Sequence, residues 1–517
     1  MSHTQQDEAA AQLEPAVTAN ALHTTQRELA SGSTPAKKKY GPDLAYTSAV
    51  KTFEEVRSHL GREMNGRWLG AMPVDAFLDK YVPATEEPLP DLSAEPFEVV
   101  PSDGVETARY DPFVSTRFAT TSVIQIAAIE GWIPHLQAVN TSKREDTVNN
   151  LKLRPDISIY NRIEGVVPPD RTDFSRMELW MEFKTNTNGA PFQDPCGDTE
   201  EERLSAIEKG SSTPDTENGN LTRGQLAHYT GAQHSLQFRH FSFSVFVQGD
   251  YARFLRWDPS GTVVTAAFNY RDDPKLMAEF LWRFDHLSAM KRGHDESIQA
   301  ANLSPEVDGR VREKLGVKDN NVPLYKYEVP GLKGMGHAYG PKPPMQNRSL
   351  VSRCTRSLPV VWIPTDNVDC GTSTCGEIGS LGDRDADPRT GEEKVVENGP
   401  WSEERTIYMK DTWQFLLDSP DVEVMAEHEI YEILHSHGTP NIPEHVAGGD
   451  GRTQTQELVD APWLCVRPRI SLYQHYRLVH RIVGRPLFKF ECTKQLVTAV
   501  FDAVQGTCAS GYAQTVR

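Results

Sequence analysis

The sequence predicts an α+β or mixed α/β protein built from two folded domains. Segments with alternating apolar residues are interleaved with segments of helical periodicity from about residue 96 to 300, which indicates a mixed sheet with flanking helices. A second set of such segments begins near residue 346. The chain has 517 residues, enough for two or more domains, and its twenty Phe and nine Trp can fill their cores.

The overall composition limits the classes of partner and compartment. The chain carries 72 Asp and Glu against 54 Lys and Arg, a net charge of −18, which argues against broad nonspecific binding of nucleic acid. A local basic groove would still allow nucleic acid to bind. Seven scattered cysteines suit a reducing compartment, and the sequence has neither a membrane-spanning apolar run nor a secretory leader. We therefore expect an intracellular protein, cytoplasmic or nuclear, with no membrane partner.

The N-terminal elements follow from composition and periodicity. Residues 1–40 have the composition of a disordered tail, and residues 41–95 form a helical segment containing AVKTFEEVRSHL and VDAFLDKYV. Residues 96–300 form the first domain, in which we expect TTSVIQIAAIEGWIPHLQ to form a mostly buried helix. Two charged strands follow, LRPDISIY (153–160) and ELWMEFKTN (178–186). A helix in RGQLAHYTGAQHSLQ, three strands and the closing helix DPKLMAEFLWRFDHL follow.

The C-terminal elements are separated from these by a predicted linker at 301–345. The second domain covers 346–517 and contains a Gly- and Asp-rich surface insertion at 364–400. Beyond the insertion we expect a strand in RTIYMKDTW, a helix at 420–437, a strand in YRLVHRIV and a helix in TKQLVTAVFDAVQG.

The two charged strands carry the first candidate site. Asp156 opens one strand, and Glu182 and Lys184 lie two apart on the other, on the same face as Trp180. If the strands are neighbours, Asp156 reaches the same end of the sheet. Asp156 and Glu182 could then bind Mg²⁺ through hard oxygen ligands, and Lys184 could position the water that the metal activates. A structural ion-pair network is the alternative, because Glu-x-Lys is a common pattern.

These residues resemble the pattern of the PD-(D/E)XK nucleases. A Pro-Asp pair ending at Asp156 precedes the tripeptide Glu-Phe-Lys, which contains Glu182 and Lys184. The next helix supplies Gln225 and Tyr229, similar to the Gln-x-x-x-Tyr of the RecB-like branch. The resemblance implies a restriction-endonuclease-like fold in which Asp156, Glu182, Lys184 and Gln225 are catalytic and the two acids bind Mg²⁺. Many proteins of that fold bind nucleic acid without cutting it.

A second candidate site lies on the C-terminal elements. Lys410 is on the strand YMKDTW, and Glu427 shares an apolar helix face with Ile430, Tyr431 and Leu434. A strand lysine paired with an inward helix glutamate holds the α- and β-phosphates of ATP in protein kinases. A lysine on a strand and a glutamate on a helix also occur in any α/β domain, so this spacing alone leaves both interpretations open.

From about residue 97 onward the chain resembles the fungal-type protein kinase domain family. The resemblance rests on segments in the family's order, among them RPDISIY, WMEFKTN, GQLAHY, RSLVSRCTRSL, MKDTW and RLVHRIVGRPLFKF. It implies a family-type N-terminal region carrying the charged strands, joined to a protein-kinase-like domain. It also implies ATP and Mg²⁺ as cofactors, with Lys410 and Glu427 at the nucleotide, and an unidentified protein as substrate or partner.

The chain departs from that family at two places that matter for activity. Ser352 and Cys354 stand where the family's phosphate loop has glycines, and their side chains would obstruct the approach of the backbone to phosphate. The sequence ends at Arg517, where the catalytic loop is expected, without His-Arg-Asp or Asp-Phe-Gly. We therefore expect a C-terminally truncated, kinase-like protein that is inactive in phosphotransfer. The alternatives are an Mg-dependent nuclease or nucleic-acid-binding protein acting through the first domain, and a non-catalytic interaction protein, a pseudoenzyme.

Overall fold

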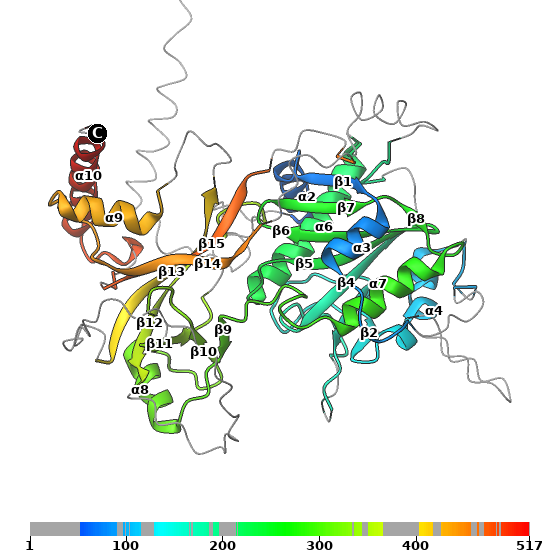
Figure 1. Cartoon of the computed structure of the whole chain (residues 1–517), viewed down its shortest axis with the longest axis horizontal. Coiled ribbons are helices and arrows are strands. Elements are labelled where there is room, and N and C mark those ends of the chain that lie inside the picture. Colours follow the sequence, from blue (N-terminus) through cyan, green and yellow to red (C-terminus); the bar gives the residue numbers. More distant parts are fainter. Residues whose placement is uncertain are drawn as a thin grey trace, which may run out of the picture.

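The structure is a computed structural model, and it describes most of the chain beyond residue 51. The described ranges, apart from one or two consecutive residues at a few places within them, are 52–89, 97–114, 129–185, 190–195, 213–343, 350–365, 403–416, 425–455, 463–464 and 470–515. The predicted tail at 1–40 and all but the first two residues of the predicted insertion at 364–400 lie outside these ranges. The fold is mixed α+β, with two sheets side by side (Figure 1) and eight α-helices among the described residues.

The first sheet is formed by the N-terminal half of the chain. Its strands are β1 (Trp68–Met72), β2 (Leu136–Asn140), β3 (Ile157–Asn161), β4 (Met177–Lys184), β5 (Ser242–Gln248), β6 (Tyr251–Asp258), β7 (Gly261–Thr265) and β8 (Phe268–Asn269). Their order is β1-β7-β6-β5-β4-β3-β2, with β8 paired to β6. β2, β3 and β4 form an antiparallel meander, whereas β5 pairs parallel with β4 after the helix α6 (Glu217–Leu236). The sheet is therefore mixed.

Helices cover both faces of the first sheet. They are α2 (Phe53–Glu63), α3 (Val74–Tyr81), α4 (Tyr110–Val114), α6 and α7 (Pro274–His286), with the short 3-10 turns η2 (Glu106–Ala108) and η3 (Glu130–Trp132). α3, α4 and α7 share a buried apolar cluster with Met181 and Phe183 of β4. α2 and α6 share another with Trp180. β4 therefore alternates as its sequence predicts, with Trp180 on one face and Met181 and Phe183 on the other.

The helices α2 and α6, which carry residues of the first candidate site, pack closely against each other. α2 begins with a capping box, in which Glu55 N donates to Thr52 Oγ1 and Thr52 N donates to Glu55 Oε2. α2 packs directly on α6 at Gly224, where a Cβ would overlap the backbone carbonyl of Arg57. The predicted helical segment at 41–95 also holds β1, which joins the first sheet beside β7, so that prediction was incomplete.

The second sheet is antiparallel throughout its named pairs. Its strands are β9 (Ile298–Ala300), β10 (Leu324–Tyr327), β11 (Gly336–Pro341), β12 (Arg356–Pro364), β13 (Arg405–Leu416), β14 (His445–Gln454) and β15 (Leu472–His480), in the order β14-β15-β13-β12-β11-β10-β9. The accompanying helices are α8 (Pro305–Leu315), α9 (Glu427–Ser436) and α10 (Thr493–Thr515), with the 3-10 turn η5 (Leu487–Lys489).

Two predictions for this half need correction. Residues 301–345 are not a linker, because they contain α8, β10 and β11 and so supply part of the second sheet. The helix predicted at 420–437 begins at Glu427, where Ala426 N donates to Glu429 Oε2 and satisfies one amide at the helix start; residues 417–424 lie outside the described ranges.

The last helix exposes apolar side chains. Val497, Val500, Phe501 and Val504 of α10 are each at least half exposed. The periodicity of Leu496, Val500, Phe501 and Val504 predicts one apolar face on this helix. Of these four residues, Leu496 is partly buried and the other three are exposed. None of the described helices is long and apolar enough to cross a membrane.

Candidate functional sites

The structure brings the predicted residues of the first site together at one end of β4. Asp156 immediately precedes β3, Glu182 and Lys184 are on β4, and Gln225 and Tyr229 are on α6. All five line one cavity of about 540 Å³. They meet because β3 and β4 are antiparallel neighbours, which places the start of β3 beside the end of β4, while α6 packs on the same face as Trp180.

Hydrogen bonds fix the geometry of these side chains. Phe183 N donates to Asp156 Oδ2 over 2.8 Å, which turns the aspartate toward β4. Glu182 Oε1 accepts from both Lys184 Nζ and Gln225 Nε2, each at 2.5 Å. Gln225 Nε2 also contacts Tyr229 OH at 2.9 Å, and Tyr229 OH donates to a backbone carbonyl over 2.8 Å. Gln225 is thus a positioning residue for Glu182.

The second oxygen of Glu182 has no such partner. The Glu182 side chain is only 2% exposed, and its Oε2 is buried with no hydrogen-bond partner among the described residues. Burial raises the pKa of Glu182. Burial, together with the nearby Glu182 charge, also raises the pKa of Asp156 to about 8. Two buried carboxyl groups therefore lie in one site. A cation bound there would contact the unpaired Glu182 Oε2 and replace the proton on Asp156.

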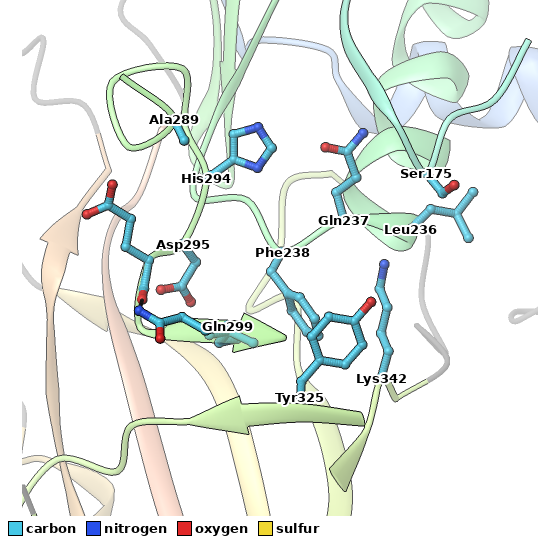
Figure 2. A pocket seen from close by; sticks show the side chains of 12 residues that line it. Ser175, Leu236, Gln237, Phe238, Ala289, His294, Asp295, Gln299, Tyr325 and Lys342 are labelled. Atoms are coloured by element: carbon cyan, nitrogen blue, oxygen red, sulfur yellow. Dashed lines mark hydrogen bonds between the residues drawn. The ribbon is translucent and has the colours of Figure 1, made fainter. Parts of the chain in front are cut away.

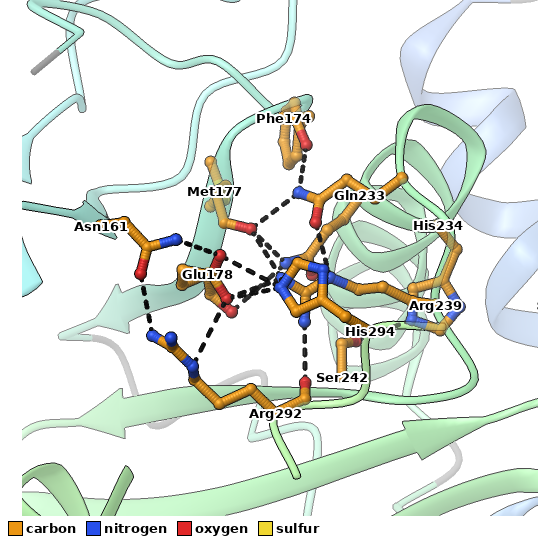
Figure 3. Close-up of polar contacts among 11 residues, drawn as sticks. Asn161, Phe174, Met177, Glu178, Gln233, His234, Arg239, Ser242, Arg292 and His294 are labelled. Atoms are coloured by element: carbon orange, nitrogen blue, oxygen red, sulfur yellow. Dashed lines mark hydrogen bonds and ion pairs between the residues drawn. The ribbon is translucent and has the colours of Figure 1, made fainter. Parts of the chain in front are cut away.

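A second glutamate on the same strand shows the contrasting arrangement. Glu178 is as buried as Glu182, but each of its oxygens is hydrogen-bonded (Figure 3). Asn161 Nδ2 donates to Oε1 at 2.7 Å, and Arg239 Nη2 and His294 Nε2 each lie 2.9 Å from Oε2. Burial favours a raised pKa, but the charges of Arg239 and His294 outweigh burial and hold the pKa of Glu178 well below its usual range. Glu178 therefore forms a structural ion pair.

Sequence reasoning missed the basic side chains that line the first cavity. Arg57, Lys143, Lys152 and Arg154 all border it, although the whole chain is acidic. They come from α2 and from the segment between β2 and β3, so no run of basic residues reveals them in the sequence. With Lys184 they make five basic residues in a lining that also holds four acidic ones, Glu106, Glu145, Asp156 and Glu182. The basic side chains away from Asp156 and Glu182 suit a ligand with negative charge.

The second predicted site forms the expected ion pair. Lys410 Nζ on β13 lies 2.7 Å from each carboxylate oxygen of Glu427, the first residue of α9. Arg353 Nη2 lies 3.1 Å from Glu427 Oε2. Burial opposes ionisation, but Lys410 and Arg353 outweigh it and lower the pKa of Glu427. Cys354 beside Arg353 has φ of +41°, a conformation that favours glycine.

A third cavity lies where the two sheets meet and was not predicted from the sequence. It has a volume of about 480 Å³ and is lined from both halves of the chain (Figure 2). Lys342 extends into it beside Tyr325 and places its amine 5.1 Å from the ring centre of Phe238. Burial, with a smaller effect of the Arg356 charge, lowers the pKa of Lys342 to about 6.

Comparison of the chain with protein-family models, with curated proteins and with solved structures finds no match. The resemblances to PD-(D/E)XK nucleases and to fungal-type protein kinases therefore stay predictions. Functional conclusions depend on the geometry of the sites described above.

Proposed function

We propose that the cavity containing Asp156, Glu182 and Lys184 is a Mg²⁺-dependent phosphodiesterase site that acts on nucleic acid. The observation that carries this proposal is Glu182 Oε2, a buried carboxylate oxygen without a hydrogen-bond partner among the described residues, beside a second buried carboxyl group. An ionised carboxylate is costly to bury unless it is paired or binds a metal. Oxygen ligands of this kind select hard divalent cations such as Mg²⁺.

The residues of the site would divide the work as follows. Asp156 and Glu182 would hold the cation, which requires the Asp156 carboxyl group to release its proton. A bound Mg²⁺ supplies a Lewis acid that lowers the pKa of a coordinated water and neutralises charge on phosphate. The Lys184 ammonium, held by Glu182 Oε1, can orient the attacking water and stabilise negative charge that develops on the phosphoryl oxygens. Gln225 keeps Glu182 in place from α6.

The four basic residues around the cavity support a polyanionic substrate. Arg57 lies on α2, whereas Lys143, Lys152 and Arg154 are spaced along the segment between β2 and β3, so a backbone with successive phosphates could contact several of them. Such contacts would give affinity without sequence preference and would weaken with added salt. This local arrangement answers the objection that the net charge of −18 raises against nucleic acid.

Purified protein with Mg²⁺ or Mn²⁺, incubated with single- and double-stranded DNA and RNA, tests the proposal. Glu182→Gln preserves shape while it removes the metal-binding charge, so cleavage should be lost. Glu178→Gln changes the same residue type on the same strand outside the cavity, and the folded fraction of that variant should still cleave. Equal product from wild type and Glu182→Gln would reject the proposal. Metal binding without cleavage would indicate that the protein binds nucleic acid without hydrolysing it.

The Lys410–Glu427 ion pair favours a second candidate function, nucleotide binding by a protein-kinase-type lobe. Lys410 would contact the α- and β-phosphates of ATP and Glu427 would hold it in position. We propose binding of Mg-ATP here, and not phosphotransfer, because the pair alone provides no catalytic base. Isothermal titration of wild type, Lys410→Met and the control Lys326→Met on β10 tests it. Equal affinity in all three proteins would reject this candidate.

A further inference from the structure

Two histidines and an aspartate meet where the two sheets contact each other. His240 lies just before β5, Asp295 lies just before β9, and His475 is on β15. One potential ligand atom from each lies within 4.8 Å of the other two. His240 Nε2 and Asp295 Oδ2 are 3.4 Å apart. Ligand atoms of a tetrahedral ion with bonds of about 2.0–2.1 Å are separated by about 3.4 Å, so this pair already has the required spacing.

The surroundings of His240 leave one ring nitrogen available. His240 Nδ1 lies 3.1 Å from Thr453 Oγ1, and Nε2 is buried without a hydrogen-bond partner among the described residues. If Nδ1–H donates to the hydroxyl, the lone pair of Nε2 faces the carboxylate oxygen of Asp295. Two acceptors at 3.4 Å repel each other unless a proton or a metal ion lies between them.

His475 has the supporting contact that metal-binding histidines typically have. Its Nε2 lies 2.7 Å from Asp411 Oδ1, and an Nε2–H donated to this carboxylate leaves the lone pair on Nδ1. Arg477 is shared, because it contacts Asp295 Oδ2 at 2.8 Å and Asp411 Oδ1 at 3.0 Å. The Arg477 guanidinium thus forms ion pairs with both Asp295 and Asp411.

We propose that His240, Asp295 and His475 bind a transition-metal ion of the Zn²⁺ class. The ion would connect β15 of the second sheet to the segments that precede β5 and β9. Two imidazoles and one carboxylate suit Zn²⁺, whereas all-oxygen sites suit Mg²⁺. Three protein ligands leave a fourth coordination position. A cavity of about 410 Å³ borders all three residues, so water or a small ligand can reach that position.

A second group of the same composition serves as a comparison. His135, Asp285 and His286 also lie within reach of one another, but the His135 side chain is 68% exposed. Asp285 already accepts from the backbone amides of His135 and Leu136. The unpaired buried nitrogen of this group, His286 Nε2, lies 3.4 Å from Glu87 Oε2, while His286 Nδ1 is 2.8 Å from the backbone carbonyl oxygen of Trp282. Because His135 is largely exposed and Asp285 is already hydrogen-bonded, we expect this group to bind Zn²⁺ weakly if at all.

The experiment titrates Zn²⁺ alone into metal-free full-length protein carrying Glu182→Gln, which removes the other metal site. Binding is measured by competition with a chromophoric chelator, and Co²⁺ is used to report coordination by its visible absorption. We expect one tight ion per chain with a tetrahedral Co²⁺ spectrum, and a raised melting temperature. Changes to residues that only contact a ligand weaken metal affinity by up to about 100-fold. His240→Ala and His475→Ala remove ligands themselves, so each should weaken Zn²⁺ affinity by more than that.

Controls separate loss of the site from loss of the fold. His135→Ala should leave Zn²⁺ affinity unchanged. Thr453→Val, which removes only the contact to His240 Nδ1, should weaken affinity by about tenfold in a folded protein. Absence of Zn²⁺ binding, or equal affinity in the parent, His240→Ala and Thr453→Val proteins, overturns the proposal and leaves a protonated His240 paired with Asp295. Loss of binding in His135→Ala would place the metal at the other group.

Discussion

Replacing Asp156 with asparagine should stabilise the metal-free protein at neutral pH. The folded-state pKa of Asp156 is about 8, against an ordinary value of 3.8 in the unfolded chain. Between those values the folded state binds more protons than the unfolded state, so the free energy of unfolding falls as pH rises from about 4 to about 8. Each pH unit corresponds to about 1.36 kcal/mol for one proton. Asparagine has no charge to bury and therefore removes this pH-dependent cost.

The stability gained by Asp156→Asn depends on the interval between the unfolded-state pKa of Asp156 and the pH of the measurement. About 3 pH units separate the unfolded pKa from pH 7, so Asp156→Asn should gain up to about 4 kcal/mol at pH 7 and nothing near pH 4. The asparagine carbonyl can still accept from Phe183 N, so the local geometry is kept. Mg²⁺ should show the opposite pattern. It should stabilise wild type more strongly as pH rises to about 8, because binding releases the proton, and it should not stabilise Asp156→Asn.

Urea unfolding at pH 7 and pH 4, with and without Mg²⁺, measures both effects. Asp146→Asn is the matched control, because Asp146 is fully buried but its two oxygens accept from Asn149 N and Phe174 N. One of those bonds is lost in asparagine, so this variant should lose about 1–3 kcal/mol. If Asp156→Asn were less stable than wild type at pH 7, or gained equally at both pH values, the raised pKa assigned to Asp156 would be wrong.

Three further outcomes are expected. Glu427→Gln should weaken the pair with Lys410 and cost roughly 1 kcal/mol, seen as faster amide exchange in α9; unchanged exchange would show that the pair does not hold the helix. Lys342, with its pKa lowered to about 6, should react with acetic anhydride at pH 7 faster than Lys326 does in peptide mass spectra, and an equal rate would contradict the lowered pKa. Phe501→Ser on α10 should reduce self-association in light scattering and leave the midpoint of unfolding unchanged, because the ring is 57% exposed; a large loss of stability would place the ring in a core.

Local periodicity predicted which side chains of the first site share a face of their own strand or helix. Residues two apart on a strand share a face, which put Glu182 and Lys184 together, and residues four apart on a helix do the same for Gln225 and Tyr229. Asp156 needed one further assumption, that the two charged strands are neighbours, and the sheet order supports it. The ion pair of the second site followed from the same kind of reasoning.

Features that depend on distant partners could not be predicted. His240, Asp295 and His475 come from three separate segments, and only the contact between the sheets brings them together. The second sheet also includes two short strands from residues 301–345, β10 and β11, and β11 contains Gly and Pro, so the local pattern resembles a linker. Pairing with longer neighbours stabilises such strands, and a sequence pattern does not contain that information.

The two glutamates of β4 show why residue type alone does not identify a functional carboxylate. Glu178 and Glu182 lie on the same strand and are equally buried, yet their pKa values shift in opposite directions. The difference comes from Arg239 and His294, which satisfy Glu178, while no described group satisfies Glu182 Oε2. A sheet that required only stability would gain by replacing an unsatisfied buried carboxylate with an apolar residue. Under the proposed function a bound cation would offset the cost of burying Glu182, so we expect metal binding and folding stability to be coupled at this residue and not at Glu178.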